Sequence, residues 1–313
     1  MKRRARQFDV RHVPVLMDAV IDALKPGPGQ IVVDCTLGLG GHSAELLRRV
    51  SPAGCTGGKL IAIDFDAANI DRARANLAAI GGEFSLHHNN FAGLPGILTS
   101  EGIERVDAIL ADVGVASPQI DDPARGFSYR KPGPLDMRMD ASRGQPASVL
   151  INRMSEREIS EALLELGDET DAPKIAKLIV ERRKIAPIET TQDLTKIVCD
   201  ARDFTLERAA GAKLHPAART FQALRMLVNR ELPNLQRLLA VAPDCLKPDG
   251  RIVIISFHSG EDRIVKKSFR DNLRDGIYSD VSDDPVMASE AEIRANPRSR
   301  SAKLRWAVRE KRN

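Results

Sequence analysis

The stretch that decides the fold is IVVDCTLGLGGHS, residues 31–43. Its apolar, β-branched start predicts a strand buried on both faces, which Asp34 ends. Three glycines follow, at positions 38, 40 and 41, and Ser43 is then a good N-cap for a helix over residues 44–50. A strand, a glycine turn and a helix in this order predict the first unit of a nucleotide-binding α/β sheet, with its ligand at the carboxyl end of the strand.

The same turn discriminates between nucleotides. A dinucleotide site favours G-x-G-x-x-G, whereas this chain has Ser43 where the third glycine belongs. The Asp34 carboxylate beside the turn would repel a pyrophosphate and attract an ammonium group. S-adenosylmethionine carries an ammonium and a sulfonium and no phosphate, so the turn favours this cofactor over NAD. From these residues alone, a merely tight connection stays open as an alternative.

Outward from this unit, buried strands are predicted at residues 59–64, 83–88 and 107–112, with a helix over 67–79. Strands that alternate with helices predict a parallel, doubly wound sheet. The sheet resumes after a helix over residues 217–242, with strands at 251–257 and 302–309. Residues 276–296, which are acidic and poor in aromatic side chains, are expected to form a long loop.

Between the two parts of the sheet, helical periods dominate, at residues 156–166, 173–184 and 191–201. No buried strand is predicted among them. We therefore expect an α/β protein in which residues 1–122 and 213–313 form the sheet domain and residues 123–212 form an inserted, all-helical domain.

Composition limits where the protein acts and which ions it holds. No apolar run approaches the roughly 20 residues that span a bilayer, and the basic start MKRRARQFDVR lacks the apolar segment of a secretory signal, so a cytoplasmic protein is expected. The four cysteines form no C-x-x-C pair, which argues against zinc and disulfides. His258 with Glu261 supplies two candidate ligands, too few for a metal site.

Positive charge is concentrated at the C-terminal end. Residues 213–313 contain 20 Lys and Arg against 13 Asp and Glu, whereas residues 1–122 contain 12 against 15. The final cluster consists of Arg294, Arg298, Arg300, Lys303, Arg305, Arg309, Lys311 and Arg312. Such a cluster favours binding to a phosphate backbone. A solvated tail is the alternative.

Further candidate site residues stand where strands end. Asp64 closes the second strand, where a carboxylate can accept both ribose hydroxyls of an adenosine. Phe91 follows the third strand and is positioned to cover the adenine, although it also suits the core. Asp112 ends the fourth strand and is expected at the same crevice as Asp34 and Asp64.

The stretch after Asp112, DVGVASPQIDDPARGFSYRKPGPLDMRMD, is rich in Gly, Pro, Asp and Arg and is expected to be irregular. Arg125, Arg130 and Arg138 are candidates to hold phosphates, and Phe127 or Tyr129 to stack on an unpaired base. The alternative is an ordered loop pinned by Arg–Asp pairs.

Five stretches in order carry a family resemblance: TLGLGGHS, ADVGVASPQIDDPARGFSY with PLDMRMD, HPAARTFQALR with VNREL, ISFHSGEDRIVK, and NPRSRSAKLR. Together they resemble the bacterial RsmH (MraW) family of small-subunit rRNA (cytosine-N4)-methyltransferases, from about His12 to Arg305. The resemblance implies a class I methyltransferase fold with a helical insertion that recognises substrate. It also implies S-adenosylmethionine as methyl donor. The implied acceptor is a cytidine of the 16S rRNA decoding region, in assembled 30S particles.

The family's cofactor contacts fall on residues of all four strand ends. They are Gly40, Gly41, His42, Asp64, Phe91, Asp112 and Gln119. Asp112 is also the candidate catalytic residue, because an acceptor that holds an N4 hydrogen of cytosine would stabilise the charge that develops there. Two other functions stay open: a dinucleotide oxidoreductase, and an RNA-binding ribosome-assembly factor without catalysis. The oligomeric state is left open.

Overall fold

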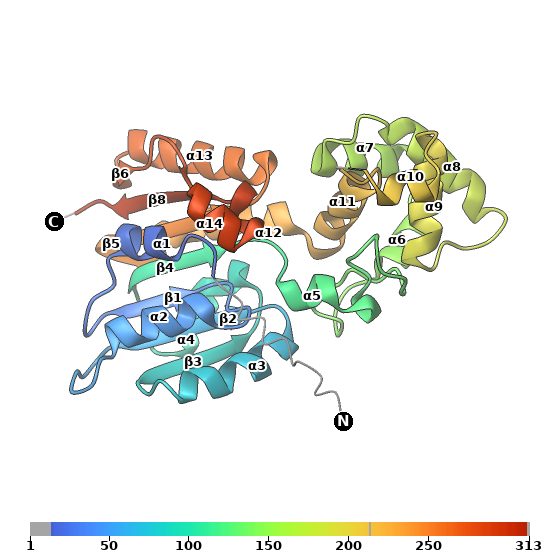
Figure 1. Cartoon of the computed structure of the whole chain (residues 1–313). Helices are drawn as coiled ribbons and strands as arrows, with labels where there is room; N and C mark the ends of the chain where they lie inside the picture. Colours follow the sequence, from blue (N-terminus) through green and yellow to red (C-terminus); the bar gives the residue numbers. More distant parts are fainter. Residues whose placement is uncertain (1–13, 213, 312–313) are drawn as a thin grey trace, which may run out of the picture. The chain divides into compact units, whose positions relative to one another are not determined.

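The computed structural model describes residues 14–212 and 214–311, so the basic arm expected at residues 1–11 and Arg312 lie outside the described residues. The chain divides into two compact units, both drawn in Figure 1. The sheet unit consists of Ala68–Gly114 with the described parts of Met1–Asp64 and Leu239–Asn313. The helical unit consists of Val115–Leu238 and the short segment Phe65–Ala67. None of the described helices is long and apolar enough to cross a membrane.

The sheet unit is built on one eight-stranded sheet, in the order β3-β2-β1-β4-β5-β8-β6, with β7 pairing β8. Its parallel strands are β1 (Ile31–Asp34), β2 (Lys59–Asp64), β3 (Glu83–His88), β4 (Val106–Asp112) and β5 (Leu246–Ser256). The antiparallel strands are β6 (Tyr278–Val281), β7 (Val286–Met287) and β8 (Lys303–Arg309). The chain moves outward from β1 to β3 and then returns to β4 on the other side of β1, which confirms the predicted doubly wound sheet.

Helices cover the sheet because its strands are apolar on both faces. Val32 and Val33, neighbours in β1 that point to opposite faces, are both fully buried. One face packs with Leu46 and Leu47 of α2 and Val20 of α1 in a single apolar cluster. The helices of this unit are α1 (Met17–Leu24), α2 (Gly41–Val50), α3 (Ala67–Ala78), α4 (Leu94–Ser100), α13 (Ser259–Arg274), α14 (Glu290–Ala295) and the end of α12 (Glu231–Cys245).

Strand register brings acidic residues to one edge of the sheet. Asp34 pairs with Ala62 of β2 and Leu110 of β4, while Asp112 pairs with Ile255 of β5. Because β1, β2 and β4 are parallel, their last residues Asp34, Asp64 and Asp112 stand at the same carboxyl edge. The predicted crevice edge is therefore present in the fold.

The helical unit has a core of its own. It contains α5 (Ser117–Asp121), α6 (Ala147–Arg153), α7 (Glu156–Gly167), α8 (Ala172–Arg183), α9 (Thr191–Ala201), α10 (Leu206–Ala210), α11 (Ala218–Asn229) and the start of α12. Leu163, Ile175 and Phe221, from α7, α8 and α11, belong to one buried cluster. Within its described residues, the unit has a single isolated β-bridge, Pro134 with Thr190, and otherwise no strand pairing.

This unit is longer than the predicted insertion 123–212 at both ends. The C-terminal extension follows from the packing of α11 against α7. At Gly167, the last residue of α7, an added Cβ would lie 2.7 Å from the Arg219 carbonyl oxygen of α11, so the two backbones approach very closely. The sequence pattern alone places α11 in the sheet domain, whereas in the structure it belongs to the helical unit.

Three local expectations are wrong. Ser43 is not the N-cap of the helix after the turn: α2 begins at Gly41 and Gly40 is its N-cap. The helix expected over residues 217–242 is two helices, because Arg230 takes a left-handed conformation (φ 52°) between α11 and α12. Residues 276–296 are not a loop, since they include β6, β7 and α14, whose N-cap is Ser289.

Candidate functional site at the carboxyl edge of the sheet

The glycine turn between β1 and α2 is shaped by packing. Gly38 and Gly40 both have positive φ angles, 51° and 80°, which disfavour other residues. An added Cβ on Gly40 would lie 3.2 Å from the Cβ of Ala73 in α3, and one on Gly41 would clash with the Pro14 ring. These glycines therefore let the turn pack against α3 and against Pro14. The sequence pattern could not distinguish this packing requirement from a requirement for close approach of a ligand.

Asp34 holds this turn together from inside. Its side chain is only 1% exposed. Oδ2 accepts a hydrogen bond of 2.6 Å from the Ser43 hydroxyl, and Oδ1 accepts one of 3.0 Å from the Thr36 amide. Ser43 thus ties the first turn of α2 to the end of β1. The Asp34 carboxylate was predicted to attract a charged ligand directly, but its hydrogen bonds are made within the chain. Its negative charge still acts on its neighbour Asp112, whose pKa it raises.

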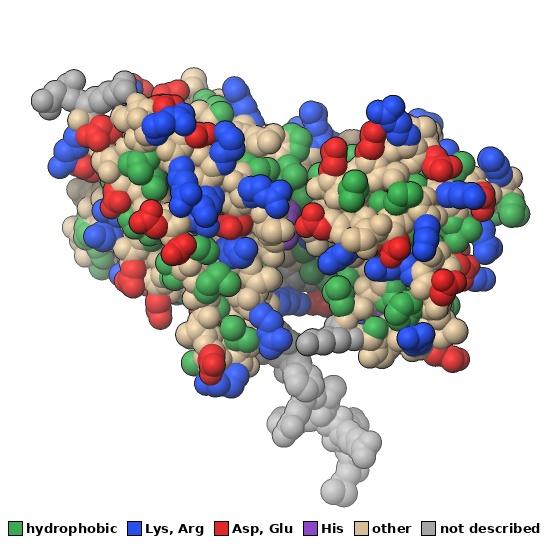
Figure 2. Space-filling view, turned by 90° about the horizontal axis from the view of Figure 1, so that it is seen from above, with side chains coloured by type: hydrophobic (Ala, Val, Ile, Leu, Met, Phe, Trp, Pro, Cys, Tyr) green, Lys and Arg blue, Asp and Glu red, His purple; other side chains and the backbone are tan. Residues whose placement is uncertain are grey.

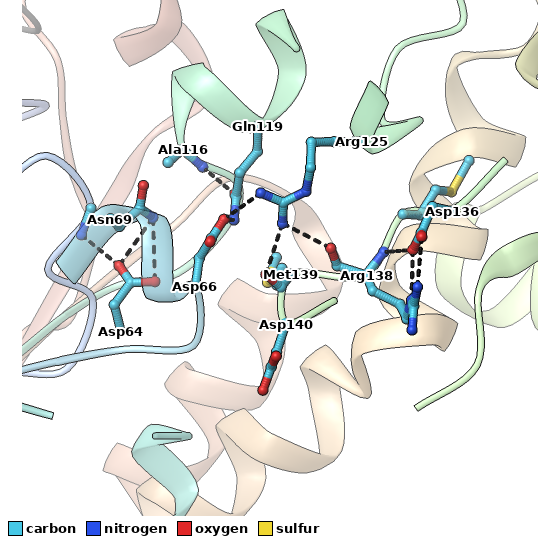
Figure 3. A network of polar contacts seen from close by, with 12 residues as sticks. Asp64, Asp66, Asn69, Ala116, Gln119, Arg125, Asp136, Arg138, Met139 and Asp140 are labelled. Atoms are coloured by element: carbon cyan, nitrogen blue, oxygen red, sulfur yellow. Dashed lines mark hydrogen bonds and ion pairs between the residues drawn. The ribbon is translucent and has the colours of Figure 1, made fainter. Parts of the chain in front are cut away.

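Asp64 is held from two sides. Its Oδ2 accepts the amide of Gly38 at 2.7 Å, so the end of β2 is tied to the glycine turn. The Asn69 amide of α3 lies 3.3 Å from both carboxylate oxygens, as Figure 3 shows. Asn69 is 2% exposed, and its own oxygen has no hydrogen-bond partner among the described residues. An amide nitrogen must face a carboxylate, because an amide oxygen there would be repelled.

Asn69 was missed by the sequence analysis. It lies in the first turns of a helix, where a polar residue is ordinarily exposed, so no periodicity marks it. The available signal was its position five residues after Asp64, which places it over the strand end.

His42 and Asp112 meet at the same edge. The His42 Nε2 lies 2.9 Å from the Val15 carbonyl oxygen, which can only accept, so Nε2 carries a hydrogen. Its Nδ1 lies 3.8 Å from Oδ2 of Asp112. The Asp112 side chain is 22% exposed, and its Oδ1 is buried without a hydrogen-bond partner in the described part of the chain. Asp112 is therefore a poorly satisfied carboxylate at the edge of the sheet.

The surroundings of Asp112 favour its protonated form. The pKa of Asp112 is raised to about 6, chiefly by burial; His42 opposes this rise, and the negative charges of Asp34 and Glu261 contribute to it. Glu261 belongs to α13, where it is 2% exposed and its Oε2 accepts the Phe257 amide at 2.9 Å. An ionisable group with a pKa near neutrality suits proton transfer.

His258 caps α13 and faces Glu261. Its Nδ1 accepts the Glu261 amide at 3.4 Å, and its Nε2 lies 3.0 Å from the Glu261 carboxylate. Both ring nitrogens therefore face Glu261. Across residues 14–212 and 214–311, no group of three His, Cys, Asp or Glu side chains is placed to hold a metal ion.

Two other predicted cofactor residues occupy different places. Phe91 is half-buried at the start of a short 3₁₀ helix, Phe91–Gly93, directly beyond β3 in the sheet unit. Gln119 lies in α5 of the helical unit, is 4% exposed and donates a hydrogen bond of 3.0 Å to Asp66. Its side-chain oxygen accepts the Ala116 amide at 3.0 Å. The polar groups of Gln119 thus have partners within its own unit.

The loop after α5 is ordered by its own ion pairs. Arg125 pairs with Asp66 at 2.7 Å and donates to the carbonyl oxygens of Arg138 and Met139 (Figure 3). Arg138 binds Asp136 through two bonds of 2.8 Å. Phe127 is buried. Of the residues predicted to hold phosphates or a base, Arg125, Arg138 and Phe127 are therefore structural, as in the pinned-loop alternative.

Tyr129 and Arg130 differ from these. The Tyr129 ring stacks on the His215 ring with 4.5 Å between the ring centroids. Arg130 is exposed, and the central carbon of its guanidinium group lies over the Tyr129 ring, 5.8 Å from the ring centroid.

The C-terminal cations separate into two groups. Arg305 is 3% exposed and binds Asp262 at 2.6 Å, so it is not available to a phosphate backbone. Lys303 pairs with the same carboxylate at 3.7 Å, and Arg309 donates to the Ile277 carbonyl oxygen at 2.6 Å. Arg294, Arg298 and Arg300 are exposed. Only part of the cluster predicted to bind RNA therefore faces solvent.

Comparison with known proteins places this edge in a family. A family model described as the MraW methylase family matches residues 9–310. The Ribosomal RNA small subunit methyltransferase H of Geotalea uraniireducens (strain Rf4) is 44% identical over 316 residues, which cover 96% of this chain and 98% of the relative. The protein of the same name from Symbiobacterium thermophilum is 42% identical over 313 residues, which cover 95% and 96%. The chain, with its glycine turn and three strand-end carboxylates, belongs to the MraW methylase family.

Proposed function

We propose that this protein methylates the exocyclic N4 of a cytidine in the decoding region of 16S rRNA, with S-adenosylmethionine as donor. Membership of the MraW methylase family supports methyl transfer, and the names of its relatives support small-subunit rRNA as the acceptor. We place the reaction in the cytoplasm, on assembled 30S particles. The cytidine, its N4 and its position come from the family resemblance.

The observation that carries the proposal is the row of carboxylates Asp34, Asp64 and Asp112 at the ends of parallel strands beside the glycine turn. This set of acceptors fits S-adenosylmethionine, which is cationic and whose ribose diol can donate hydrogen bonds. It does not fit a pyrophosphate, which three carboxylates would repel. The Oδ1 atom of Asp112, buried and without a hydrogen-bond partner among residues 14–212 and 214–311, fits the same interpretation, because a cation or a hydrogen-bond donor would satisfy it.

The residues that would hold the cofactor come mainly from the sheet unit. Asp64 is assigned to the ribose hydroxyls and Phe91 to the adenine. Gly40, Gly41, His42 and Asp112 are assigned to the methionine end. Gln119 is carried over from the family resemblance only. When bound, S-adenosylmethionine supplies an electrophilic methyl group.

The chemical difficulty lies in the acceptor. The N4 lone pair of cytosine is shared with the ring, so N4 is a poor nucleophile, and it gains positive charge as it attacks. Asp112 accepts an N4 hydrogen in the proposed mechanism, which stabilises that charge and then takes up the released proton. A carboxyl with a pKa of about 6 is ionised enough near neutrality to act in this way.

The two units divide the work in this proposal. The sheet unit binds the cofactor, and the helical unit, which contains the predicted insertion 123–212, recognises substrate. The observation that supports the second role is the separate core of the helical unit, which lets its surface vary independently of the sheet.

The decisive experiment is mass spectrometry of small-subunit rRNA from cells with and without the gene. We expect one N4-methylated cytidine to be lost with the gene and restored by the purified protein with S-adenosylmethionine on 30S particles. RNA binding without methyl transfer would instead support an assembly factor. Tight binding of NADH without binding of S-adenosylmethionine would support an oxidoreductase.

A further inference from the structure

Helix α13 (Ser259–Arg274) presents a row of cations to solvent. Its buried side chains are Glu261, Val265 and Phe269. Its outward side carries four exposed cations, named here the α13 stripe: Arg263, Lys267, Arg270 and Arg274. At about 100° per residue these four fall within about 60° of one another around the helix axis. Figure 2, which looks onto the side of the sheet unit that carries α13, shows Lys and Arg side chains on that side with Asp and Glu side chains among them.

The acids at the start of α13 are turned to internal partners. Glu261 accepts the Phe257 amide and faces His258. Asp262 is bound by Arg305 at 2.6 Å and approached by Lys303 at 3.7 Å, both from β8. Because these carboxylates are neutralised beneath the helix, they do little to reduce the positive potential on its outer side.

Within the stripe, the charges are only partly compensated. Asp271 pairs with Lys267 at 2.6 Å and with Arg274 at 3.3 Å, and Asp275 adds a contact to Arg274. Arg263 and Arg270 form no ion pair with any other residue that the structure describes. Neither arginine has an acid three or four residues away along the helix that could offset its charge, so the two leave a net positive surface on one line.

The position of the stripe connects it to the site. α13 follows β5, whose parallel neighbour β4 ends at Asp112. Arg263 stands two residues beyond Glu261, whose charge acts on Asp112. From Arg263 the stripe extends over about 16 Å, at about 1.5 Å per residue. It is therefore a basic track that starts at the carboxyl edge of the sheet.

We propose that the α13 stripe binds the phosphate backbone of the RNA strand that presents its base at Asp112. Four long cationic side chains in one line suit successive phosphates of one strand, and contacts to phosphates position a strand without reading its bases. The inference rests on the proposed function, because it takes RNA as the substrate. It assigns backbone binding to a helix that lies outside the C-terminal cluster.

The test removes three charges of the stripe, as Arg263→Gln, Lys267→Gln and Arg270→Gln together. Binding of 30S particles from cells that lack the gene is measured without cofactor at several salt concentrations. Each lost phosphate contact flattens the slope of log K against log salt by about 0.7 for a single strand, so we expect a loss of about two units and weaker binding. Affinity for S-adenosylmethionine and the melting temperature should match wild type.

The matched control removes three exposed cations elsewhere on the sheet unit, as Arg72→Gln, Arg74→Gln and Arg105→Gln. Its salt slope should stay at the wild-type value. An unchanged slope in the stripe variant, or an equal flattening in the control, would overturn the inference. A third outcome separates the inference from the proposed function. If the stripe variant flattens the salt slope but the wild-type protein transfers no methyl group to the particle, the proposed function is wrong and the stripe remains an RNA-binding surface.

Discussion

The Nδ1 atom of His42 and the Oδ2 atom of Asp112 face each other at 3.8 Å, and the other ring nitrogen of His42 is held by the Val15 carbonyl oxygen. Because that carbonyl accepts a hydrogen bond from Nε2, the ring is held with Nδ1 toward the carboxyl. At this place His42 lowers the pKa of Asp112, against the larger effect of burial. The contact with the Val15 carbonyl oxygen therefore positions a side chain that acts on Asp112.

The first prediction concerns catalysis by Asp112. If Asp112 holds an N4 hydrogen, Asp112→Asn should lower single-turnover methyl transfer about a hundredfold, as for the loss of one preorganised electrostatic contact. The measurement uses 30S particles at saturating S-adenosylmethionine. In wild type, the rate should rise with pH through about 6, because the ionised carboxylate is the acceptor. A near-normal rate for the variant would leave Asp112 with cofactor binding alone.

The second prediction concerns stability and pH. The pKa of Asp112 is raised from 3.8 in the unfolded chain to about 6 in the folded protein, so the folded state binds the extra proton. Stability from this group is therefore present below about pH 4 and is lost as pH rises to about 6, by at most about 3 kcal/mol. Urea unfolding across this range should show the stability of wild type falling relative to that of Asp112→Asn as the pH rises. Parallel pH profiles would contradict the assignment.

The third prediction concerns Asp64, the carboxylate proposed to hold the ribose. Asp64→Ala should weaken binding of S-adenosylmethionine by about 1.5–3 kcal/mol, the range for a hydrogen bond to a charged group. Asn69→Ala should weaken it less, since the Gly38 amide still holds Asp64. In calorimetry, the double variant should bind S-adenosylmethionine no more weakly than Asp64→Ala does, because Asn69 acts through the Asp64 carboxylate. Additive losses would show that Asn69 acts independently.

The fourth prediction separates the C-terminal cations. Arg305→Met should destabilise the protein, because it leaves the Asp262 carboxylate with Lys303 alone. Removing one partner of a buried pair costs about 3–5 kcal/mol, and Lys303 should hold the loss toward the lower end. Chemical unfolding measures this loss. By contrast, Arg298→Gln with Arg300→Gln should leave stability within about 0.5 kcal/mol, as for surface changes. Equal stability of all variants would refute the structural role of Arg305.

Much of the sheet and of its acidic edge follows from sequence pattern. Apolar runs that end in Asp34, Asp64 and Asp112 report strands buried on both faces, and parallel topology then brings their ends together. These inferences depend on periodicity and chain order, which are local properties.

What pattern could not provide depends on tertiary partners. Ser43 looks like an N-cap because of its type and place, but Asp34 captures its hydroxyl from below the helix. Arg305 looks like a solvent cation, yet Asp262 on another element buries it. Strand β6 is not predicted from the sequence, because the contacts that stabilise it come from other elements. It pairs with β8, and its Tyr278 ring makes an edge contact with the Phe269 ring of α13. The contacting residues are at least nine positions apart in the chain, which is beyond the reach of helix or strand periodicity.

The helical unit also affects how the protein is made. β4 ends at Asp112, and its neighbour β5 begins only at Leu246, after the chain has passed through the entire helical unit. During synthesis, β4 is therefore complete while one of its edges lacks a partner, and such edges promote aggregation. A helical unit that folds early shortens the effective loop that must close before β5 docks. Substitutions in its core should thus lower the yield of native protein even where they leave the methyl-transfer edge untouched.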